Sequence, residues 1–319
     1  MVGKLTPDTI ISASKVPALL GMSPYSSPND ILKEVVDIIH NDTRPAFWGG
    51  NEATRWGDRL EPVVLGEVAK RLSLTDVVLD HDIAVFHPTL EMACSLDGSG
   101  VGVGQVKTSV ENLIYTMNAP EIDITGPGVL EAKVTSAMPE DMPPPQRGPL
   151  QLQAQMMCTG YTWGVVATLY RGIELRLFVY QEDDAIQKRI ADAVDDFERR
   201  KRDIDWYPPL TSEDANTAWG NVDDAAPPID LDDLGASMLI ADLVQAKTDK
   251  TDAEDRIEAA EVSIKEIMGN HEAAEGTVGN TLYNVKWPMR HFKDKPERLT
   301  PAKPAYSTRQ KTLTIKERL

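Results

Sequence analysis

The fold is decided by a strand-like stretch near the middle of the chain, Gly128-Val129-Leu130-Glu131-Ala132-Lys133-Val134. Successive side chains of a strand point to opposite faces, so Glu131 and Lys133 share one face and the apolar residues between and beside them share the other. The apolar face can enter a core, and the charged face suits a cleft. Because many Glu-x-Lys pairs lie on solvated faces, the spacing alone leaves a catalytic pair and a surface pair both open.

A second acidic residue, Asp97, precedes Gly98 in a predicted turn upstream of this strand. Two carboxylates can share a hard divalent cation such as Mg²⁺ or Mn²⁺, which binds few protein oxygens and keeps several waters. A neighbouring lysine can then orient the attacking water or neutralise charge on a phosphate. Glu61, predicted at the start of a helix, offers a third carboxylate or, alternatively, a partner for that helix dipole.

Two glutamines follow on the helix predicted over 150–160. Gln151 and Gln155 are four residues apart, so they share one face of that helix. Amides in this position can orient a water or contact phosphate oxygens, although glutamines at such spacing are also found as exposed surface residues. We expect Gln151 to point into the same cleft as Lys133, with Gln155 one turn further along.

The remaining pattern predicts an α/β protein with an appendage. Apolar periodicity predicts helices over 11–20, 28–39, 59–72 and 183–201, and strands over 77–79, 83–86, 161–169 and 173–179. The glycine-rich segment 98–128 is expected to be a long hairpin or an inserted loop. A proline-rich break indicates a nuclease-sized domain over 1–207, a linker over 208–230 and, over 231–319, charged helices, a short hairpin and a basic tail.

Charge and cysteine content limit the classes of protein. The chain has 319 residues and a net charge of −17, yet residues 280–319 carry ten Lys or Arg and three Asp or Glu. The acidic remainder argues against non-specific coating of a polyanion, whereas the basic end suits a nucleic acid, a partner or merely solvent. Two cysteines, Cys94 and Cys158, are too few for a disulfide framework and fit a reducing cytosol. No apolar run approaches the ~18 residues of a membrane span, and we expect no signal peptide.

Five motifs occur in an order that resembles a known family. They are Ile11-Ser12-Ala13-Ser14-Lys15-Val16, Trp56-Gly57 with Leu60-Glu61-Pro62, Ala93-Cys94-Ser95-Leu96-Asp97-Gly98, Leu130-Glu131-Ala132-Lys133, and Gln151-Leu152-Gln153-Ala154-Gln155 ending in Thr159-Gly160. The series resembles the phage lambda exonuclease and YqaJ-type viral recombinase nucleases, a branch of the PD-(D/E)xK superfamily, over about residues 8–205. The resemblance implies a restriction-endonuclease-like core, with a central mixed sheet flanked by helices.

The resemblance also implies an activity and residue roles. The activity is Mg²⁺-dependent degradation of one strand of linear duplex DNA from a 5′ end in the host cytoplasm. It implies a ring-shaped homo-oligomer, and a single-strand annealing recombinase is a candidate partner. By the same resemblance, the metal carboxylates are Glu61, Asp97 and Glu131, the catalytic lysine is Lys133, the first glutamine of the helix motif is Gln151, and the serine at the 5′-phosphate is Ser14.

The sequence departs from the family pattern in three places, the first being Leu96 where the family has a proline before the aspartate. The gap from Asp97 to Glu131 is 34 residues, longer than the compact family hairpin. Where the family has an arginine seven residues before Ser14, this chain has Pro7, with Lys4 nearby, which leaves 5′-phosphate recognition and polarity open. Two alternatives therefore stand beside the exonuclease: an endonuclease of the same superfamily acting on branched or single-stranded DNA, and a non-catalytic DNA- or partner-binding protein on this fold.

Overall fold

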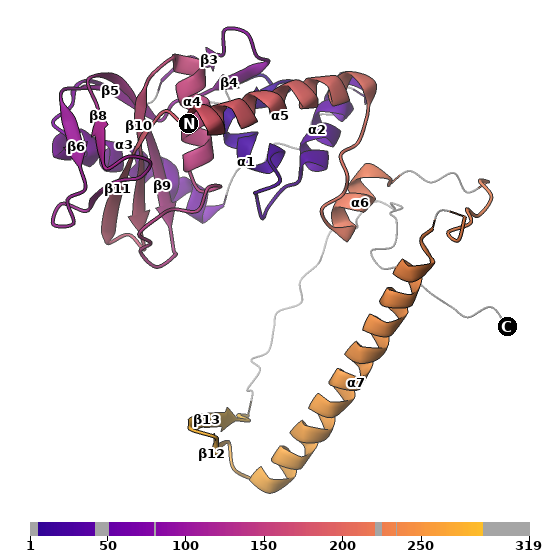
Figure 1. Cartoon of the computed structure of the whole chain (residues 1–319). Helices are drawn as coiled ribbons and strands as arrows, with labels where there is room; N and C mark the ends of the chain where they lie inside the picture. Colours follow the sequence, from indigo (N-terminus) through magenta and orange to yellow (C-terminus); the bar gives the residue numbers. More distant parts are fainter. Residues whose placement is uncertain (1–5, 42–50, 80, 221–224, 234, 290–319) are drawn as a thin grey trace, which may run out of the picture. The chain divides into compact units, whose positions relative to one another are not determined.

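The computed structural model describes residues 6–41, 51–79, 81–220, 225–233 and 235–289 (Figure 1). Its internal contacts divide the chain into two compact units, Met1–Gly220 and Asn221–Leu319. All residues predicted for the active site lie in the first unit. The second unit consists of a long helix and a short hairpin.

The first unit is built on a mixed six-stranded sheet. Its strand order is β2-β5-β9-β10-β11-β7. The strand predicted to decide the fold, β9, lies antiparallel to β5 on one side and parallel to β10 on the other. The strands are β2 Thr75–Leu79, β5 Gly98–Gly102, β7 Ile114–Thr116, β9 Gly126–Thr135, β10 Trp163–Tyr170 and β11 Glu174–Gln181. This arrangement confirms the predicted central mixed sheet.

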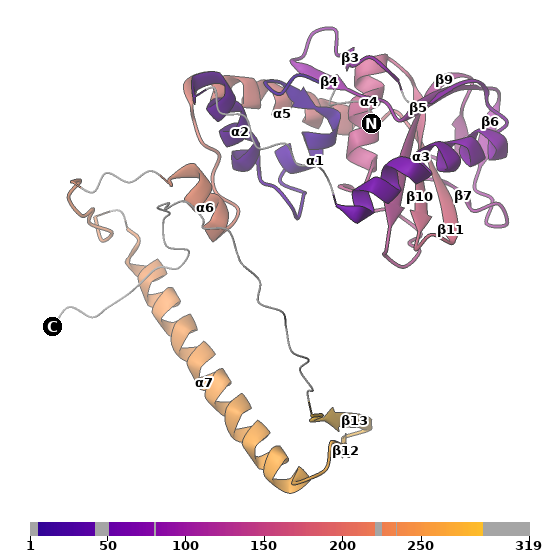
Figure 2. The same ribbon diagram turned by 180° about the vertical axis from the view of Figure 1, so that it is seen from behind.

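Helices cover both faces of this sheet. Figure 1 shows α4 (Pro149–Thr159) and α5 (Asp184–Asp203) in front of the strands, and Figure 2 shows α3 (Glu52–Arg71) on the opposite face. Neighbouring strand residues alternate between two buried clusters: Val166 packs with the α4 side, and Val165 packs with the α3 side. The predicted flanking of the sheet by helices is therefore confirmed, and Glu131, which shares a face with Val129, points toward α4.

A second, three-stranded sheet lies beside α4. In it, β1 (Ile11–Ser12) pairs in parallel with β4 (Met92–Cys94), which also pairs with β3 (Val85–Phe86). The prediction of one helix over 11–20 is wrong in its first part. The chain forms β1, a 3₁₀ turn η1 (Ala13–Lys15) and the short helix α1 (Val16–Leu19) before α2 (Pro28–Asn41). Pairing with a strand eighty residues away overrides the local helical pattern.

The glycine-rich segment after Asp97 is folded. It contains β5, β6 (Gln105–Lys107), β7 and β8 (Glu121–Asp123), of which β6 and β8 pair as a separate antiparallel ladder. The short strand β7 pairs in parallel with β11 and forms one edge of the main sheet. The inserted segment is therefore neither a simple hairpin nor an irregular loop.

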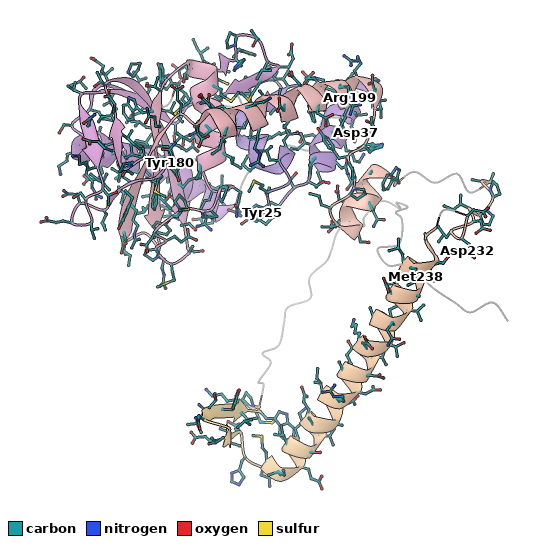
Figure 3. All side chains as sticks on the ribbon, in the orientation of Figure 1. Tyr25, Asp37, Tyr180, Arg199, Asp232 and Met238 are labelled. Carbon is teal, nitrogen blue, oxygen red and sulfur yellow. The ribbon has the colours of Figure 1, made fainter. Side chains whose placement is uncertain are left out.

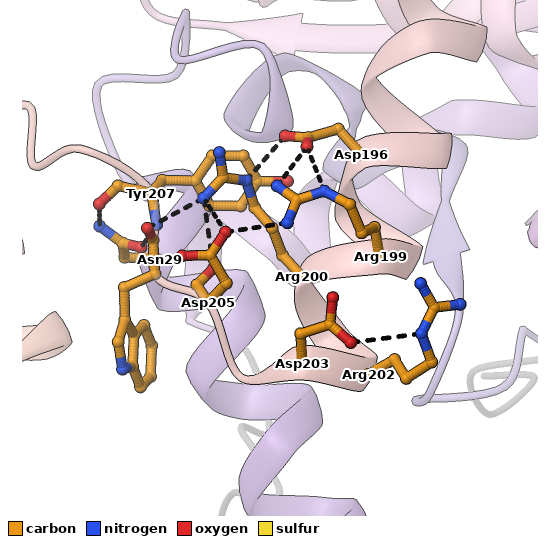
Figure 4. A network of polar contacts seen from close by, with 9 residues as sticks. Asn29, Asp196, Arg199, Arg200, Arg202, Asp203, Asp205 and Tyr207 are labelled. Atoms are coloured by element: carbon orange, nitrogen blue, oxygen red, sulfur yellow. Dashed lines mark hydrogen bonds and ion pairs between the residues drawn. The ribbon is translucent and has the colours of Figure 1, made fainter.

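A polar network fixes the chain where it leaves α5 (Figure 4). The side-chain amide of Asn29 on α2 accepts from the backbone N–H of Tyr207 at 2.8 Å and donates to its carbonyl at 3.0 Å. The Arg200 guanidinium lies 4.3 Å from the centre of the Tyr207 ring and donates to Asp196 at 2.7 Å. Because Asn29 is fully buried, these bonds hold residues after α5 against α2.

The predicted linker over 208–230 differs from the structure in its first half. Residues Ser212–Ala218 form a helix, α6, which packs against α2. Asp214 of α6 is 3% exposed and accepts hydrogen bonds from the Ser27 hydroxyl at 2.5 Å and from the Leu210 N–H at 2.7 Å. This part of the segment therefore belongs to the folded first unit.

The second unit contains α7 (Ser237–Met268) and an antiparallel hairpin of β12 (Ala273–Val278) and β13 (Thr281–Lys286). The hairpin turns at Gly279, which has a positive φ of 60°. Most of the predicted basic tail, residues 290–319, lies outside the described residues. No helix in the described part of the chain combines the length and the apolar character needed to cross a membrane.

Candidate active site

Asp97 and Glu131 lie opposite each other on neighbouring antiparallel strands. Gly98 of β5 pairs with Leu130 of β9, so the residue before Gly98 meets the residue after Leu130. Asp97 Oδ2 also accepts a hydrogen bond from the backbone N–H of Ala132 at 3.0 Å. The two carboxylates predicted from widely separated motifs therefore meet at the end of β5.

Lys133 lies beside this pair and faces α4. Its Nζ donates to Glu131 Oε1 and, at 3.1 Å, to Gln151 Oε1. The Lys133 side chain is 28% exposed, whereas that of Glu131 is 1% exposed. The Lys133 side chain is thus less buried than the carboxylate it contacts, and Gln151 points toward its ammonium group, as expected from the sequence.

Gln155 is the site residue whose contact the sequence did not predict. Its Nε2 donates to Glu131 Oε2 at 2.7 Å and to the Ser95 carbonyl at 3.3 Å. Its Oε1 is buried and accepts no hydrogen bond from the described residues. The spacing with Gln151 placed both amides on one face, but only the packing of α4 on β9 identifies Glu131 as the acceptor.

Burial and charge shift two pKa values in the cluster. Burial, together with the negative charges of Glu131 and Glu61, raises the pKa of Asp97 to about 8, although Lys133 and the Ala132 N–H act in the opposite direction. Burial alone lowers the pKa of Lys133, but the three carboxylates outweigh burial and raise it. The lysine is therefore held as a cation, whereas Asp97 keeps its proton up to about pH 8 in the absence of a bound cation.

Glu61 lies on α3, at the centre of the helix rather than at its start. The helix begins at Glu52, capped by Asn51, whose side chain accepts from the Thr54 N–H at 3.0 Å. A position nine residues inside the helix excludes the alternative that Glu61 pairs with the dipole of the first turn. Glu61 is half-buried, and its charge raises the pKa values of Asp97 and Lys133.

Ser14 is exposed on η1, and its hydroxyl lies 3.0 Å from the Ser12 hydroxyl. The turn packs against α4, the helix that carries both site glutamines. The adjacent Lys15 donates to Glu34 at 2.7 Å, so its charge is already paired. Ser14 is thus on a neighbouring element, but it makes no contact with the described side chains of the carboxylate cluster.

The carboxylates of Asp97 and Glu131 are the two adjacent groups that could bind a divalent cation. Among the described residues, no three His, Cys, Asp or Glu side chains group closely enough to hold a metal ion. The sequence predicted that Glu61, Asp97 and Glu131 would form one metal-binding group. The structure joins Asp97 and Glu131 but does not bring Glu61 into one group with them. Mg²⁺ commonly uses one or two carboxylates plus water and substrate phosphate. The excess negative charge that raises the pKa of Asp97 fits such a cation.

A buried carboxylate pair with a lysine two residues along the same strand suits phosphodiester hydrolysis. Residues 7–162 match the family model of the YqaJ-like viral recombinase domain. Family and site together indicate a nuclease. No curated protein sequence matches the chain.

Three solved structures are similar in part. LHK-Exo in complex with dAMP is 19% identical, covers 61% of this chain and 89% of its own, and has a TM-score of 0.44. LHK-Exo, an alkaline exonuclease from Laribacter hongkongensis, solved separately, has 18% identity with the same coverages and TM-score. A phage-related exonuclease from Haemophilus somnus 129PT is 11% identical, with 61% and 94% covered and a TM-score of 0.37. Such low values leave the assignment of function to the family match and the geometry of the site.

Proposed function

We propose that the chain is a divalent-metal-dependent deoxyribonuclease that degrades one strand of linear duplex DNA from a 5′ end, as in phage recombination. One observation carries the proposal. Asp97 lies opposite Glu131, and Lys133 is hydrogen-bonded to Glu131, within a YqaJ-like viral recombinase domain. The 5′ polarity rests on the resemblance of the motifs.

The carboxylates of Asp97 and Glu131 would hold Mg²⁺ or Mn²⁺, with Glu61 adding negative potential from α3. A bound cation supplies positive charge for the scissile phosphate and lowers the pKa of a water. Gln155 and Lys133 each donate to one oxygen of Glu131 and so fix its carboxylate. The Lys133 ammonium, kept protonated by its neighbours, neutralises charge that develops on the phosphate or holds the attacking water.

The remaining roles belong to the same proposal. Gln151 accepts from Lys133 and thereby holds the ammonium group beside Glu131. Ser14 is proposed to contact the 5′-phosphate, because its hydroxyl is exposed on the turn that packs against α4. A ring-shaped homo-oligomer and a single-strand annealing recombinase partner are proposed from the resemblance.

Degradation of matched DNA substrates tests the proposal. Linear duplex should be degraded with Mg²⁺ and not with EDTA, and a covalently closed circle should resist. Blocking the 5′ ends with phosphorothioate linkages should stop degradation, whereas blocking the 3′ ends should not. Cutting of the closed circle would instead establish the endonuclease alternative, and metal-independent binding without any cleavage would establish the non-catalytic one.

Substitutions connect that activity to the cluster. Asp97→Asn and Lys133→Met should each lower cleavage by about a hundredfold or more, because each removes a charge aimed at the phosphate. The controls are Asp123→Asn and Lys107→Met, which change exposed residues on β8 and β6. Full activity in Asp97→Asn would contradict the assignment of the site.

A further inference from the structure

Within the described residues of its own unit, helix α7 has no packing partner along almost its whole length. Of its 32 residues, only Met268 is buried, and Leu243 and Lys265 are half-buried. Large apolar side chains lie in solvent along it, including Met238 at 71% exposure (Figure 3), Ile257 at 59% and Ile267 at 85%. Most helical stability in proteins comes from packing an apolar face, so a helix of this length requires a partner.

The sequence of α7 carries an unbroken heptad repeat with alternating steps of three and four residues. In heptads lettered a to g, positions a and d face the partner helix of a coiled coil. The a positions are Leu243, Lys250, Ile257 and Ile264. The d positions are Leu239, Ala246, Ala253, Ala260 and Ile267. Large residues thus dominate a, whereas alanine fills the three central d positions.

We infer that α7 pairs with α7 of a second copy of this chain as an antiparallel coiled coil in which Lys250 faces Ala253. In an antiparallel pair, each a residue packs against a d residue of the other helix. In this register the other a–d pairs, which together form the seam between the helices, are Leu243 with Ala260, Ile257 with Ala246, and Ile264 with Leu239. Three of the four layers then combine one large and one small side chain, and the stem of Lys250 can lie over an alanine while its charge reaches water.

Charges beside the seam fit the same register. Antiparallel pairing brings e against e and g against g of the second helix. Lys247 (e) then meets Glu254 (e), and Asp249 (g) meets Arg256 (g). The twofold symmetry makes each pair twice, which gives four pairs of opposite charge and no pair of like charge.

Other arrangements bring like charges together. A parallel in-register pair stacks Lys250 on Lys250 and opposes Asp249 to Glu254. An antiparallel shift of one heptad in one direction opposes Lys247 to Lys247 and Asp249 to Asp249. A shift in the other direction opposes Glu254 to Glu254 and Arg256 to Arg256. The sequence therefore disfavours these alternatives as well as favouring the proposed register.

The proposed register also uses the whole helix. Its twofold axis passes between Thr251 and Asp252, next to the midpoint of α7, so the overlap extends over nearly all of its 32 residues. At 1.5 Å per residue the paired length is about 48 Å. A displaced register would leave apolar residues at both ends without a partner.

Site-specific cross-linking of the full-length chain tests the inference. Asp242 and Ser263 occupy g positions that face each other across the two copies in the proposed register. A mixture of an Asp242→Cys chain and a Ser263→Cys chain should therefore form a cross-linked heterodimer with a short bis-maleimide. Each variant alone should give no homodimer, because two copies of one position lie on the order of 30 Å apart.

Both native cysteines are buried, so wild-type protein gives the background. Adding Lys247→Glu to both chains should lower the heterodimer yield about tenfold, because it places two glutamates opposite each other. Adding Lys247→Glu together with Glu254→Lys should restore the yield, because the two charges of each pair are then exchanged. A Ser263→Cys homodimer would overturn the inference in favour of a parallel pair. Absence of every cross-link would overturn it altogether.

Discussion

Gln155 donates to Glu131 Oε2 at 2.7 Å, while Lys133 donates to Oε1 of the same carboxylate. Both oxygens of a side chain that is 1% exposed are thereby held from two elements, α4 and β9. Buried polar atoms in proteins are nearly always hydrogen-bonded, because leaving one without a partner destabilises the fold. The amide of Gln155 is therefore part of what keeps the Glu131 carboxylate oriented.

Removing that amide should reduce activity more than stability. Gln155→Leu deletes the donor to Glu131, and loss of a residue that orients a metal-binding group typically lowers metal affinity or activity by about 10- to 100-fold. The measurement is the rate of linear-DNA degradation against Mg²⁺ concentration. We expect the Mg²⁺ dependence to shift to higher concentration.

Gln153→Leu is the matched control on the same helix. Gln153 is also buried, but it accepts from the Asp183 N–H at 3.0 Å and donates to the Gln181 carbonyl at 2.9 Å, away from the site. This variant should lower the midpoint of thermal unfolding and leave the Mg²⁺ dependence unchanged. Equal Mg²⁺ dependence in both variants would show that Gln155 is only structural.

Gly57 is predicted to leave room for substrate beside Glu61. It lies one helical turn before Glu61 on the same face of α3, and a methyl group built on it would meet no atom within 4 Å. Its backbone is not in the left-handed region, so neither conformation nor internal packing requires glycine there. Gly57→Ala should raise the free energy of unfolding by about 0.5–1 kcal/mol and weaken DNA cleavage.

Gly66 provides the comparison. It lies on the exposed face of the same helix, and a methyl group there also meets nothing within 4 Å. Gly66→Ala should give the same stabilisation without any loss of cleavage, and Gly57→Val should lower cleavage further than Gly57→Ala. Unchanged activity in Gly57→Val would contradict a DNA path along this face.

His87 should make the fold less stable at mildly acidic pH. Its Nδ1 accepts from the N–H groups of Thr89 and Leu90 at 3.2 and 3.0 Å, which requires the neutral ring, and burial lowers the pKa of His87 below 6.5. As the pH falls below about 6.5, the His87 ring is protonated more readily in the unfolded chain than in the folded one. The free energy of unfolding therefore falls as pH decreases from 7 to 5.

His87→Asn tests this by keeping an acceptor near the Nδ1 position while removing the titration. The quantity to compare is the difference in free energy of unfolding between variant and wild type at each pH, because other titrating groups cancel in it. That difference should move in favour of the variant as pH falls. A difference that stays constant with pH for His87→Asn would refute the prediction.

The sequence predicted the centre of the first unit better than its periphery. The helix over 150–160 and the strand pair around Arg171-Gly172 rest on local patterns, and both are present, with Gly160, Arg171 and Gly172 at positive φ. Such positions depend on neighbouring residues only, so a single sequence contains the information. The placement of Gln151 and Gln155 on one face of that helix follows from the same regular geometry, whereas their contacts with Lys133 and Glu131 depend on the packing of α4 on β9.

The elements that were missed depend on distant contacts. Strand β7 is three residues long and exists because β11 offers an unpaired edge. The N-terminal part of α3 exposes Trp56 and Val63, so apolar periodicity does not mark its start at Glu52. For the same reason, the alternative roles of Glu61 could be separated only after the helix was seen.

The final prediction concerns where the first unit ends. A chain of residues 1–220 retains α6 and all the residues of the candidate site. We expect it to fold, to unfold at the temperature of the first transition of the full chain and to cleave DNA.

A chain of residues 1–211 loses Asp214, which is buried against Ser27, and leaves the Leu210 N–H without its acceptor. Each lost hydrogen bond costs about 0.5–1.5 kcal/mol, so the shorter chain should unfold several degrees lower. Asp214→Ala in the full-length chain should reproduce that loss, whereas Glu213→Ala, an exposed neighbour, should not. If the two truncated chains were equally stable, α6 would be part of a linker, as the sequence alone had suggested; if neither folded, the second unit would belong to the core.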